Sequence, residues 1–272
     1  MTKAKINGID MHYQSYGEGE TIVFAHGAGG NLLSWWQQIP FFSQRYRCVT
    51  FDQRGFGHSL DVSGGPGAAS FVEDLAGLLD HLEVESAHLV AQSMGGRTCL
   101  GFAVAYPNRS KSLVMADTTG GMAVAQVTDL QKQWRETHEP TTELALRAIS
   151  PGFVQRNPEL AQLYLQISRT NPPRPEASVP QQEGPGTNQL SQMKVPTLFI
   201  VGEEDEIAPP HVIEAASRTI SGATVTRVPE AGHSVYFEKP EIFNFEVLRF
   251  IQGTTGTAGS PKPVIAEPAR VG

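Results

Sequence analysis

The sequence contains little cysteine, no cluster of basic residues and no long apolar run. Of its 272 residues only two are cysteine, Cys48 and Cys99, and both lie in apolar stretches. So small a number argues against a disulfide framework and a cysteine-rich zinc site, and we expect two buried free thiols. The formal net charge is -7 at pH 7, and lysine and arginine form no run. This charge argues against nucleic acid and anionic membrane surfaces as partners.

Signals for export and for membrane insertion are also missing. Residues 1–5 lead directly into strand-like sequence and contain no apolar signal-peptide region. No apolar stretch reaches the roughly 20 residues that a membrane-spanning helix needs. We therefore expect a cytoplasmic protein whose partner is a small-molecule substrate. The sequence leaves the oligomeric state open.

What the chain does contain is a regular alternation of short apolar runs and helical patterns. Residues 3–16 alternate in polarity around Asn7-Gly8, which predicts an antiparallel hairpin at a sheet edge. Continuous apolar runs follow at residues 21–25, 47–51, 87–91 and 112–116, and helices are expected at 34–44, 68–82 and 95–106. Buried strands joined by helices form a mostly parallel sheet, so we predict one large α/β domain.

Between residues 118 and 192 this rhythm breaks. Helices are expected at 125–138, 142–149 and 158–169, and a proline-rich stretch follows them. We interpret 118–192 as a lid inserted into a core formed by 1–117 and 193–252. Several apolar side chains give the lid its character: Leu144, Leu146, Phe153, Leu160, Leu163 and Tyr164.

The alternation resumes after the lid. The sequence predicts strands at 195–201 and 223–228 and helices at 210–219 and 240–252. Residues 253–272 are rich in glycine, threonine, proline and alanine, and we expect them to form a disordered tail.

One junction between an apolar run and a helical segment carries a serine. In Ala91-Gln92-Ser93-Met94-Gly95-Gly96, small residues stand two positions to either side of Ser93, which is typical of a nucleophile elbow. The usual first glycine is replaced by Ala91, whose methyl group still permits a tight turn. Asp205 and His233 also follow predicted strands. Because the carboxyl ends of parallel strands share one edge of a sheet, we expect the three side chains to meet there.

Ordered motifs along nearly the whole chain resemble the α/β-hydrolase superfamily. These are His26-Gly27, Asp52-x-Arg54-Gly55-x-Gly57-x-Ser59, Ser93-x-Gly95-Gly96, Gly202-x-x-Asp205 and Gly232-His233. The resemblance implies the α/β-hydrolase fold, with Ser93 as nucleophile, His233 as general base and Asp205 as the acid that orients the histidine. It also implies an oxyanion hole made by the backbone N–H groups of Ala28 and Met94.

Other polar residues near these motifs allow more than one interpretation. Asp117 is the alternative acid, because some members of the superfamily place the acid after the preceding strand. For Asp52 and Arg54 we favour an ion pair that stabilises a turn over a catalytic role. His26 is expected to support the oxyanion loop through hydrogen bonds, and His58 to be a solvated loop residue.

Gln92 and Tyr236 are candidates for contact with substrate. Packing is the alternative for both residues, because Gln92 flanks the elbow and Tyr236 follows the histidine in an apolar stretch.

A serine at the elbow separates this chain from the haloalkane dehalogenases and epoxide hydrolases of the superfamily, which use aspartate. Acyl chemistry remains, and we predict a hydrolase for the carboxylic ester or lactone of a small, fairly apolar substrate. No metal-ligand cluster or dinucleotide fingerprint is present, so no cofactor is expected. The alternatives are a carbon–carbon bond hydrolase of a vinylogous diketone, a cofactor-free perhydrolase or haloperoxidase, and a ligand receptor with slow turnover.

Overall fold

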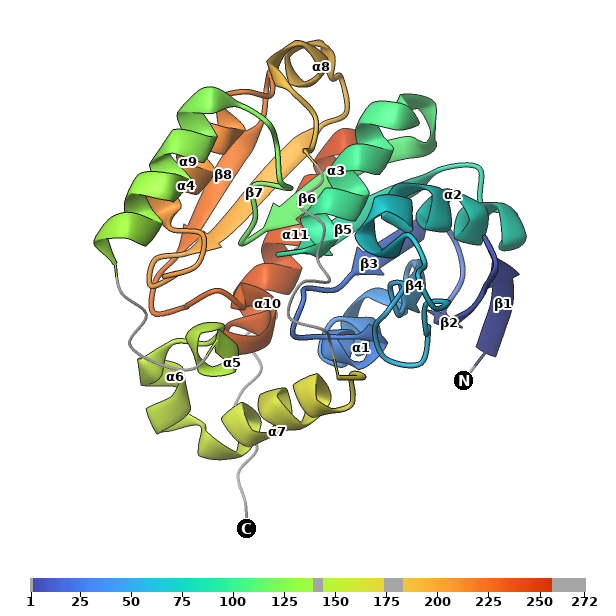
Figure 1. Ribbon diagram of the computed structural model, residues 1–272, viewed down its shortest axis with the longest axis horizontal. Helices are drawn as coiled ribbons and strands as arrows, with labels where there is room; N and C mark the ends of the chain where they lie inside the picture. Colours follow the sequence, from blue (N-terminus) through green and yellow to red (C-terminus); the bar gives the residue numbers. More distant parts are fainter. Residues whose placement is uncertain (1, 139–143, 174–182, 256–272) are drawn as a thin grey trace.

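The computed structural model describes residues 2–138, 144–173 and 183–255, whose strands form one eight-stranded sheet (Figure 1). The strands are β1 (Thr2–Ile6), β2 (Ile9–Tyr16), β3 (Thr21–Ala25), β4 (Arg47–Phe51), β5 (Ala87–Gln92), β6 (Ser110–Ala116), β7 (Thr197–Gly202) and β8 (Thr224–Val228). Their spatial order is β1-β2-β4-β3-β5-β6-β7-β8. The β1–β2 and β2–β4 pairs are antiparallel, and the five remaining pairs are parallel. The predicted mostly parallel α/β architecture is confirmed.

The predicted edge hairpin is present. Ile6 pairs with Ile9, and the two turn residues between them have positive φ angles, 44° at Asn7 and 85° at Gly8. Such a two-residue turn matches the right-handed twist of the flanking strands, and it is the conformation that asparagine followed by glycine favours. The hairpin places β1 at one end of the sheet.

Alternate residues of the central strands face two separate apolar layers. Val23 of β3 and Leu89 of β5 belong to one buried cluster, whereas Phe24 and Val90, the next residue of each strand, belong to the other. Since successive side chains of a strand point to opposite faces, both faces of the sheet are covered. This explains why these strands read as continuous apolar runs rather than alternating ones.

Helices provide the two covering layers. They are α1 (Ile39–Phe42), α2 (Phe71–His81), α3 (Gly95–Ala105), α4 (Ala125–Thr137), α5 (Leu144–Arg147), α6 (Pro151–Arg156), α7 (Pro158–Arg169), α8 (Thr187–Gln192), α9 (Pro210–Ser217), α10 (Val235–Glu238) and α11 (Pro240–Thr255). Three short 3-10 helices accompany them: η1 (Leu32–Trp35), η2 (Gly67–Ser70) and η3 (Pro107–Arg109). In Figure 1, α2, α3 and α9 lie in front of the sheet and α11 lies behind it.

The structure corrects several predicted helix boundaries. The helix expected at 34–44 is split into η1 and α1, because Pro40 lacks a backbone N–H and is accepted only in the first turn of a helix. The helix expected at 68–82 is a 3-10 turn followed by α2. The last helix continues to Thr255, so residues 253–255 are helical rather than part of a tail. The rest of the predicted tail, 256–272, lies outside the described residues.

The segment between β6 and β7 divides into two parts. Helix α4 packs against α9, and the Trp134 Nε1–H donates a hydrogen bond of 2.8 Å to the carbonyl of Glu206. Helices α6 and α7 pack on each other, and Phe153 and Tyr164 join the apolar layer that includes α10 and α11. That residues 118–192 act as one lid stays a prediction. Within this segment, α4 contacts the core helix α9. The side chain of Leu144 lies outside the described part, and Leu163 is exposed.

Both cysteines are free and buried, as predicted. Burial raises the pKa of the Cys48 thiol to about 12, because the apolar interior disfavours a thiolate. Within the described ranges, no helix combines the length and the apolar character that crossing a bilayer requires.

Candidate active site

Ser93 lies in a strained turn between β5 and α3. Its φ angle is 49°, a left-handed conformation that is rare for a residue with a side chain, and its N–H donates to the carbonyl of Ala116 at 3.0 Å. A Cβ on Gly95 would overlap the backbone carbonyl of Ala25, so the helix approaches β3 too closely for any other residue. Ala91 is fully buried in the core, where its methyl group is accommodated. The local geometry is that of the predicted elbow.

A continuous hydrogen-bonded chain joins Ser93, His233 and Asp205. The His233 Nε2 lies 2.8 Å from the Ser93 Oγ, and its Nδ1 lies 2.8 Å and 3.0 Å from the two carboxylate oxygens of Asp205. Because an ionised carboxylate only accepts, Nδ1 carries the hydrogen and Nε2 is left to accept from the serine hydroxyl. Asp205 Oδ1 also accepts from the backbone N–H groups of Ile207 and Ala208, which fix the carboxylate.

The electrostatic surroundings raise the pKa of His233. Burial alone lowers the pKa of the imidazole, because it removes water from the charged form. The charge and hydrogen bond of Asp205, together with the charges of Asp117 and Glu238, outweigh burial and raise the pKa above the ordinary 6.5. The site is therefore arranged to stabilise an imidazolium ion.

Asp117, the alternative acid, is fully buried at the end of β6 with a φ angle of 53°. Its two oxygens accept from the backbone N–H groups of Gly202 and Val235, each at 3.1 Å. Burial, and then the negative charge of Asp205, raise the pKa of Asp117 well above the usual range for a carboxyl. The histidine Nδ1 thus bonds to Asp205, while Asp117 joins the segments that carry Asp205 and His233.

The loop after β3 is held against the elbow by a buried polar network. His26 Nδ1 donates to the carbonyl of Gly27 at 2.8 Å, and its Nε2 accepts from the N–H of Gln53 at 3.0 Å. The Gln53 amide donates to the carbonyl of His26 at 2.7 Å and accepts from the Thr98 hydroxyl of α3. The expected structural role of His26 agrees with these contacts.

The two expected oxyanion donors flank Ser93. A Cβ on Gly27 would lie 3.1 Å from the Ser93 Cβ and would overlap the Gln92 side chain, so the loop that carries Ala28 touches the elbow. Met94 directly follows Ser93 at the start of α3. Donation by the N–H groups of Ala28 and Met94 to an oxyanion stays a prediction.

The side chains of the two candidate substrate-binding residues both contact other parts of the protein. Gln92 is buried, and its Nε2 donates to the carbonyl of His233 at 2.7 Å. Tyr236 is also buried, and its ring lies 4.8 Å from that of Trp35 and 6.4 Å from that of Phe243. These contacts match the packing alternative; contact of either side chain with substrate stays a prediction.

The ion pair expected between Asp52 and Arg54 is wrong. Asp52 accepts from the N–H groups of Leu32 and His58 at 2.8 and 2.9 Å, so its carboxylate is used to order backbone. Arg54 instead forms two hydrogen bonds of 2.7 Å with Asp74 of α2. The predicted stabilising role of both residues is retained with different partners, and His58 is exposed as expected.

Several residues that hold the site lacked a recognisable sequence signal. Glu238 accepts from the N–H of Gly232 and from that of Ser150, both at 3.0 Å, and so joins the histidine loop to α6. The hydroxyl of Tyr164, from α7, lies 3.0 Å from the Ser234 Oγ. Ser234 adjoins His233, but nothing local indicates a partner 70 residues away.

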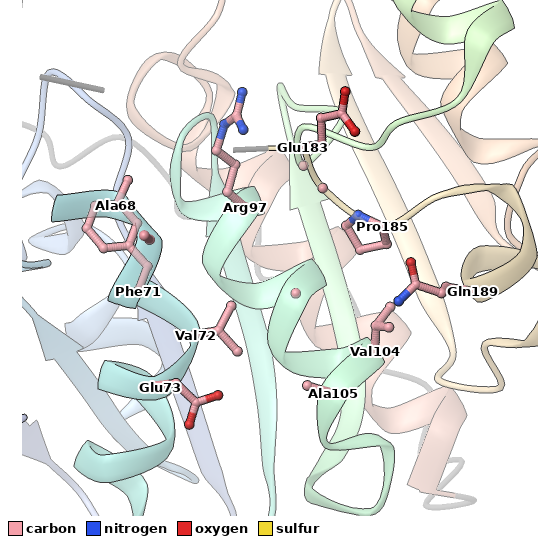
Figure 2. Close-up of a pocket in the computed structure, with 14 residues that line it drawn as sticks. Ala68, Phe71, Val72, Glu73, Arg97, Val104, Ala105, Glu183, Pro185 and Gln189 are labelled. Carbon is pink, nitrogen blue, oxygen red and sulfur yellow. The ribbon is translucent and has the colours of Figure 1, made fainter. Parts of the chain in front are cut away.

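A cavity of about 450 Å³ lies beside α3 (Figure 2). Its walls come from α2, α3 and residues 183–189, and Figure 2 shows Arg97 and Glu183 at one end of it. None of the three hydrogen-bonded residues of the elbow site lines this cavity. Among the described residues, no group of three or more His, Cys, Asp and Glu side chains is arranged to hold a metal ion.

Known proteins share both the sequence pattern and the fold. The 3-oxoadipate enol-lactonase 2 of Acinetobacter baylyi is 27% identical over 246 residues, which cover 88% of this chain and 92% of the relative. The 2-hydroxy-6-oxo-6-phenylhexa-2,4-dienoate hydrolase of Comamonas testosteroni is 28% identical over 288 residues, covering 92% and 95%. A solved thermophilic esterase from Thermogutta terrifontis aligns with a TM-score of 0.80 and 26% identity, covering 93% of this chain and 98% of its own.

The family match spans most of the chain. Residues 20–240 match the family model described as alpha/beta hydrolase fold. This range contains six of the eight strands, β3 to β8, together with the elbow, Asp205 and His233. Strands β1 and β2 of the edge hairpin precede it. With the mostly parallel sheet and the strained serine turn already described, the match shows that the chain belongs to the α/β hydrolase fold family.

Proposed function

We propose that the protein is a serine hydrolase that cleaves the carboxylic ester or lactone of a small, fairly apolar substrate through an acyl-enzyme. The observation that carries this proposal is the Ser93–His233–Asp205 hydrogen-bond chain at a strained elbow. A serine hydroxyl is a weak nucleophile until a neighbouring base takes its proton, and this arrangement supplies that base.

The reaction follows from the protonation states of these three residues. His233 Nε2 takes the Ser93 proton as Oγ bonds to the substrate carbonyl carbon, and Asp205 stabilises the resulting imidazolium. The oxyanion accepts hydrogen bonds from the N–H groups of Ala28 and Met94. The imidazolium then gives its proton to the leaving oxygen as the carbon–oxygen bond breaks. Water, deprotonated by the same imidazole, hydrolyses the acyl-enzyme and regenerates the serine.

Apolar groups near the segment that carries His233 support the expected substrate class. Phe153 and Tyr164 of the β6–β7 segment pack with Phe237, which lies four residues after His233. We propose that α6 and α7 form the part of the lid that covers the acyl group. A small acyl chain would be enclosed largely by hydrocarbon, where its transfer from water is favourable.

A substrate panel on native protein and the Ser93→Ala variant tests the proposal. Short p-nitrophenyl esters and simple lactones should be hydrolysed by the native protein, and Ser93→Ala should reduce kcat by several orders of magnitude. The variant should keep the thermal unfolding temperature of the native protein, which separates loss of chemistry from loss of fold. Near-native turnover by Ser93→Ala would overturn the proposal.

A carbon–carbon bond hydrolase is the second candidate, because the Comamonas testosteroni relative is named for such a substrate. A vinylogous diketone included in the same panel distinguishes the two. Cleavage of the diketone without ester or lactone hydrolysis favours the second candidate. Peroxide-dependent halogenation that exceeds hydrolysis indicates a perhydrolase, and binding with very slow turnover indicates a receptor.

A further inference from the structure

Helix α7 is joined directly to the loop that carries the expected oxyanion donor. The Asn31 side-chain amide donates to the Thr170 hydroxyl at 2.7 Å, and the Asn171 amide donates to the carbonyl of Gly30 at 3.2 Å. Asn31 is buried, so its hydrogen bonds are shielded from competing water. The carboxyl end of α7 is therefore positioned relative to the catalytic edge, and so are the side chains that precede it.

Tyr164, in the middle of α7, places its hydroxyl between two catalytic loops. The hydroxyl lies 3.0 Å from the Oγ of Ser234, the residue after His233. On the other side, a Cβ built on Gly29 of the loop after β3 would lie 3.8 Å from it. The phenol ring packs edge-on against Phe237 with centroids 5.0 Å apart, which restricts its orientation.

The two hydroxyls together retain one hydrogen-bond donor. Each hydroxyl has a single O–H, and only one of the two is used in the bond between Tyr164 and Ser234. Among the residues that the structure describes, no other side-chain hydrogen bond involves either hydroxyl. Since both residues are buried, an O–H without an acceptor is costly, and an oxygen atom of a ligand would satisfy it.

Burial of the two hydroxyls decides whether a charged or an uncharged ligand oxygen fits. Burial is the main reason why the pKa of Tyr164 is raised to about 12, with a further contribution from Glu238 and Asp117, so the phenol stays a neutral donor. The same burial makes this part of the site unfavourable for an additional negative charge, because a buried carboxylate loses its hydration. An uncharged ketone or hydroxyl oxygen is therefore preferred over a carboxylate.

We propose that the Tyr164–Ser234 hydroxyl pair binds an uncharged oxygen on the acyl part of the substrate. This inference rests on the proposed hydrolase function, because the acyl group on Ser93 would lie beside both loops that border the pair. It narrows the substrate class to esters and lactones of oxo- or hydroxy-acids that lack a carboxylate at that position.

Three esters with one leaving group test this preference. p-Nitrophenyl pentanoate, 4-oxopentanoate and hydrogen succinate have similar acyl lengths and carry at the fourth acyl carbon a methylene, a ketone and a carboxylate, respectively. The native protein should show a kcat/KM for the oxo ester roughly three- to tenfold above that for the pentanoate, the range that one neutral hydrogen bond supplies. The succinate ester should be the poorest of the three.

Tyr164→Phe should reduce the oxo-to-pentanoate ratio of kcat/KM to about one, and Ser234→Ala should lower it in the same direction. Tyr106→Phe is the matched control, because it removes a phenol hydroxyl that bonds to Glu73 at the far end of α3. This control should leave the ratio unchanged.

Three results would overturn the inference alone: equal native rates on the oxo and plain esters, a native preference for the succinate ester, or an unchanged ratio in Tyr164→Phe. An unchanged ratio that accompanies an equal loss on both neutral esters would indicate a structural role for Tyr164. Native protein that hydrolyses none of the three esters instead overturns the proposed function, and the inference with it.

Discussion

Backbone groups around Ser93 and His233 are bound by side chains that take no part in the proposed chemistry. Gln92 binds the carbonyl of His233, Thr118 binds the carbonyl of Ser93 at 2.7 Å, and Asp117 binds the N–H of Val235. A positive φ at Ser93 and at Asp117 is tolerated because these contacts offset its cost. At the residue scale, the site is positioned by hydrogen bonds to backbone.

The raised pKa of His233 has a consequence for the pH dependence of activity. The base must be neutral to accept the serine proton, so kcat/KM should fall as pH decreases through the histidine pKa. Because that pKa is raised, the acidic limb should have its midpoint above 6.5. A kcat/KM profile from about pH 5 to 9 with a p-nitrophenyl ester checks this. A midpoint below 6.5 would contradict the assignment of the carboxylate charges.

The two carboxylates should respond differently to neutralisation. Asp205→Asn removes the negative charge that stabilises the imidazolium and introduces an amide donor that can hold the wrong histidine tautomer, so kcat should fall by about three to four orders of magnitude. Asp117→Asn keeps the Asp205 bond and removes one acceptor of a backbone N–H group, so a smaller loss is expected. Steady-state kinetics of both variants decide between them. A larger loss in Asp117→Asn would identify Asp117 as the acid.

Helices of the β6–β7 segment differ in what they contact. Helix α4 packs on the core helix α9, whereas α7 contacts η1, which follows the loop after β3. Glu238 of α10 joins the start of α6 to the histidine loop. At the scale of elements, α6 and α7 are therefore attached to both loops that border the elbow.

Removing one attachment of α7 should impair the oxyanion loop. In Asn171→Ala the carbonyl of Gly30 and the N–H of Gly57 both lose a side-chain partner. Because small displacements of catalytic groups are costly, kcat should fall about tenfold. Kinetics on p-nitrophenyl acetate measure this, and Asn188→Ala, on the short helix α8, serves as the control. A change confined to KM would show that the contact does not position the donors.

One buried ion pair connects distant parts of the whole molecule. The Arg54 guanidinium, in the loop after β4, binds both oxygens of Asp74 on α2 and the carbonyl of Asn7 in the edge hairpin. Its side chain is 1% exposed and that of Asp74 is 2% exposed. Three elements far apart in sequence thus share one desolvated charge cluster.

Breaking this pair should destabilise the protein without altering the elbow. Arg54→Met leaves the Asp74 carboxylate buried without its cation and with the Asn7 amide as a side-chain donor, at a cost of about 3–5 kcal/mol in the free energy of unfolding. Lys132→Ala, which removes an exposed pair with Glu136, should cost less than about 1 kcal/mol. Urea unfolding monitored by circular dichroism compares the two variants. Equal stability of both would contradict the role given to Arg54.

Local sequence patterns were sufficient for much of the fold. The hairpin at Asn7-Gly8 and the parallel strands were predictable because turn chemistry and apolar runs are properties of neighbouring residues. The helix expected at 34–44 is interrupted, because Pro40 lies in the first turn of α1 and cannot occupy the interior of a longer helix. The short helices α6 and α8 escaped prediction, since six residues contain too few turns to show a periodicity.

The sequence by itself determined the elbow, the order of its three polar residues and the membership of the α/β hydrolase fold family. Only the tertiary structure decided that the ring nitrogens of His233 face Ser93, 140 residues away, and Asp205 rather than Asp117. It likewise decided the pairing of Arg54 with Asp74 and of Tyr164 with Ser234. The physical reason is that motifs depend on local backbone geometry, whereas hydrogen-bond partners depend on which distant segments pack together.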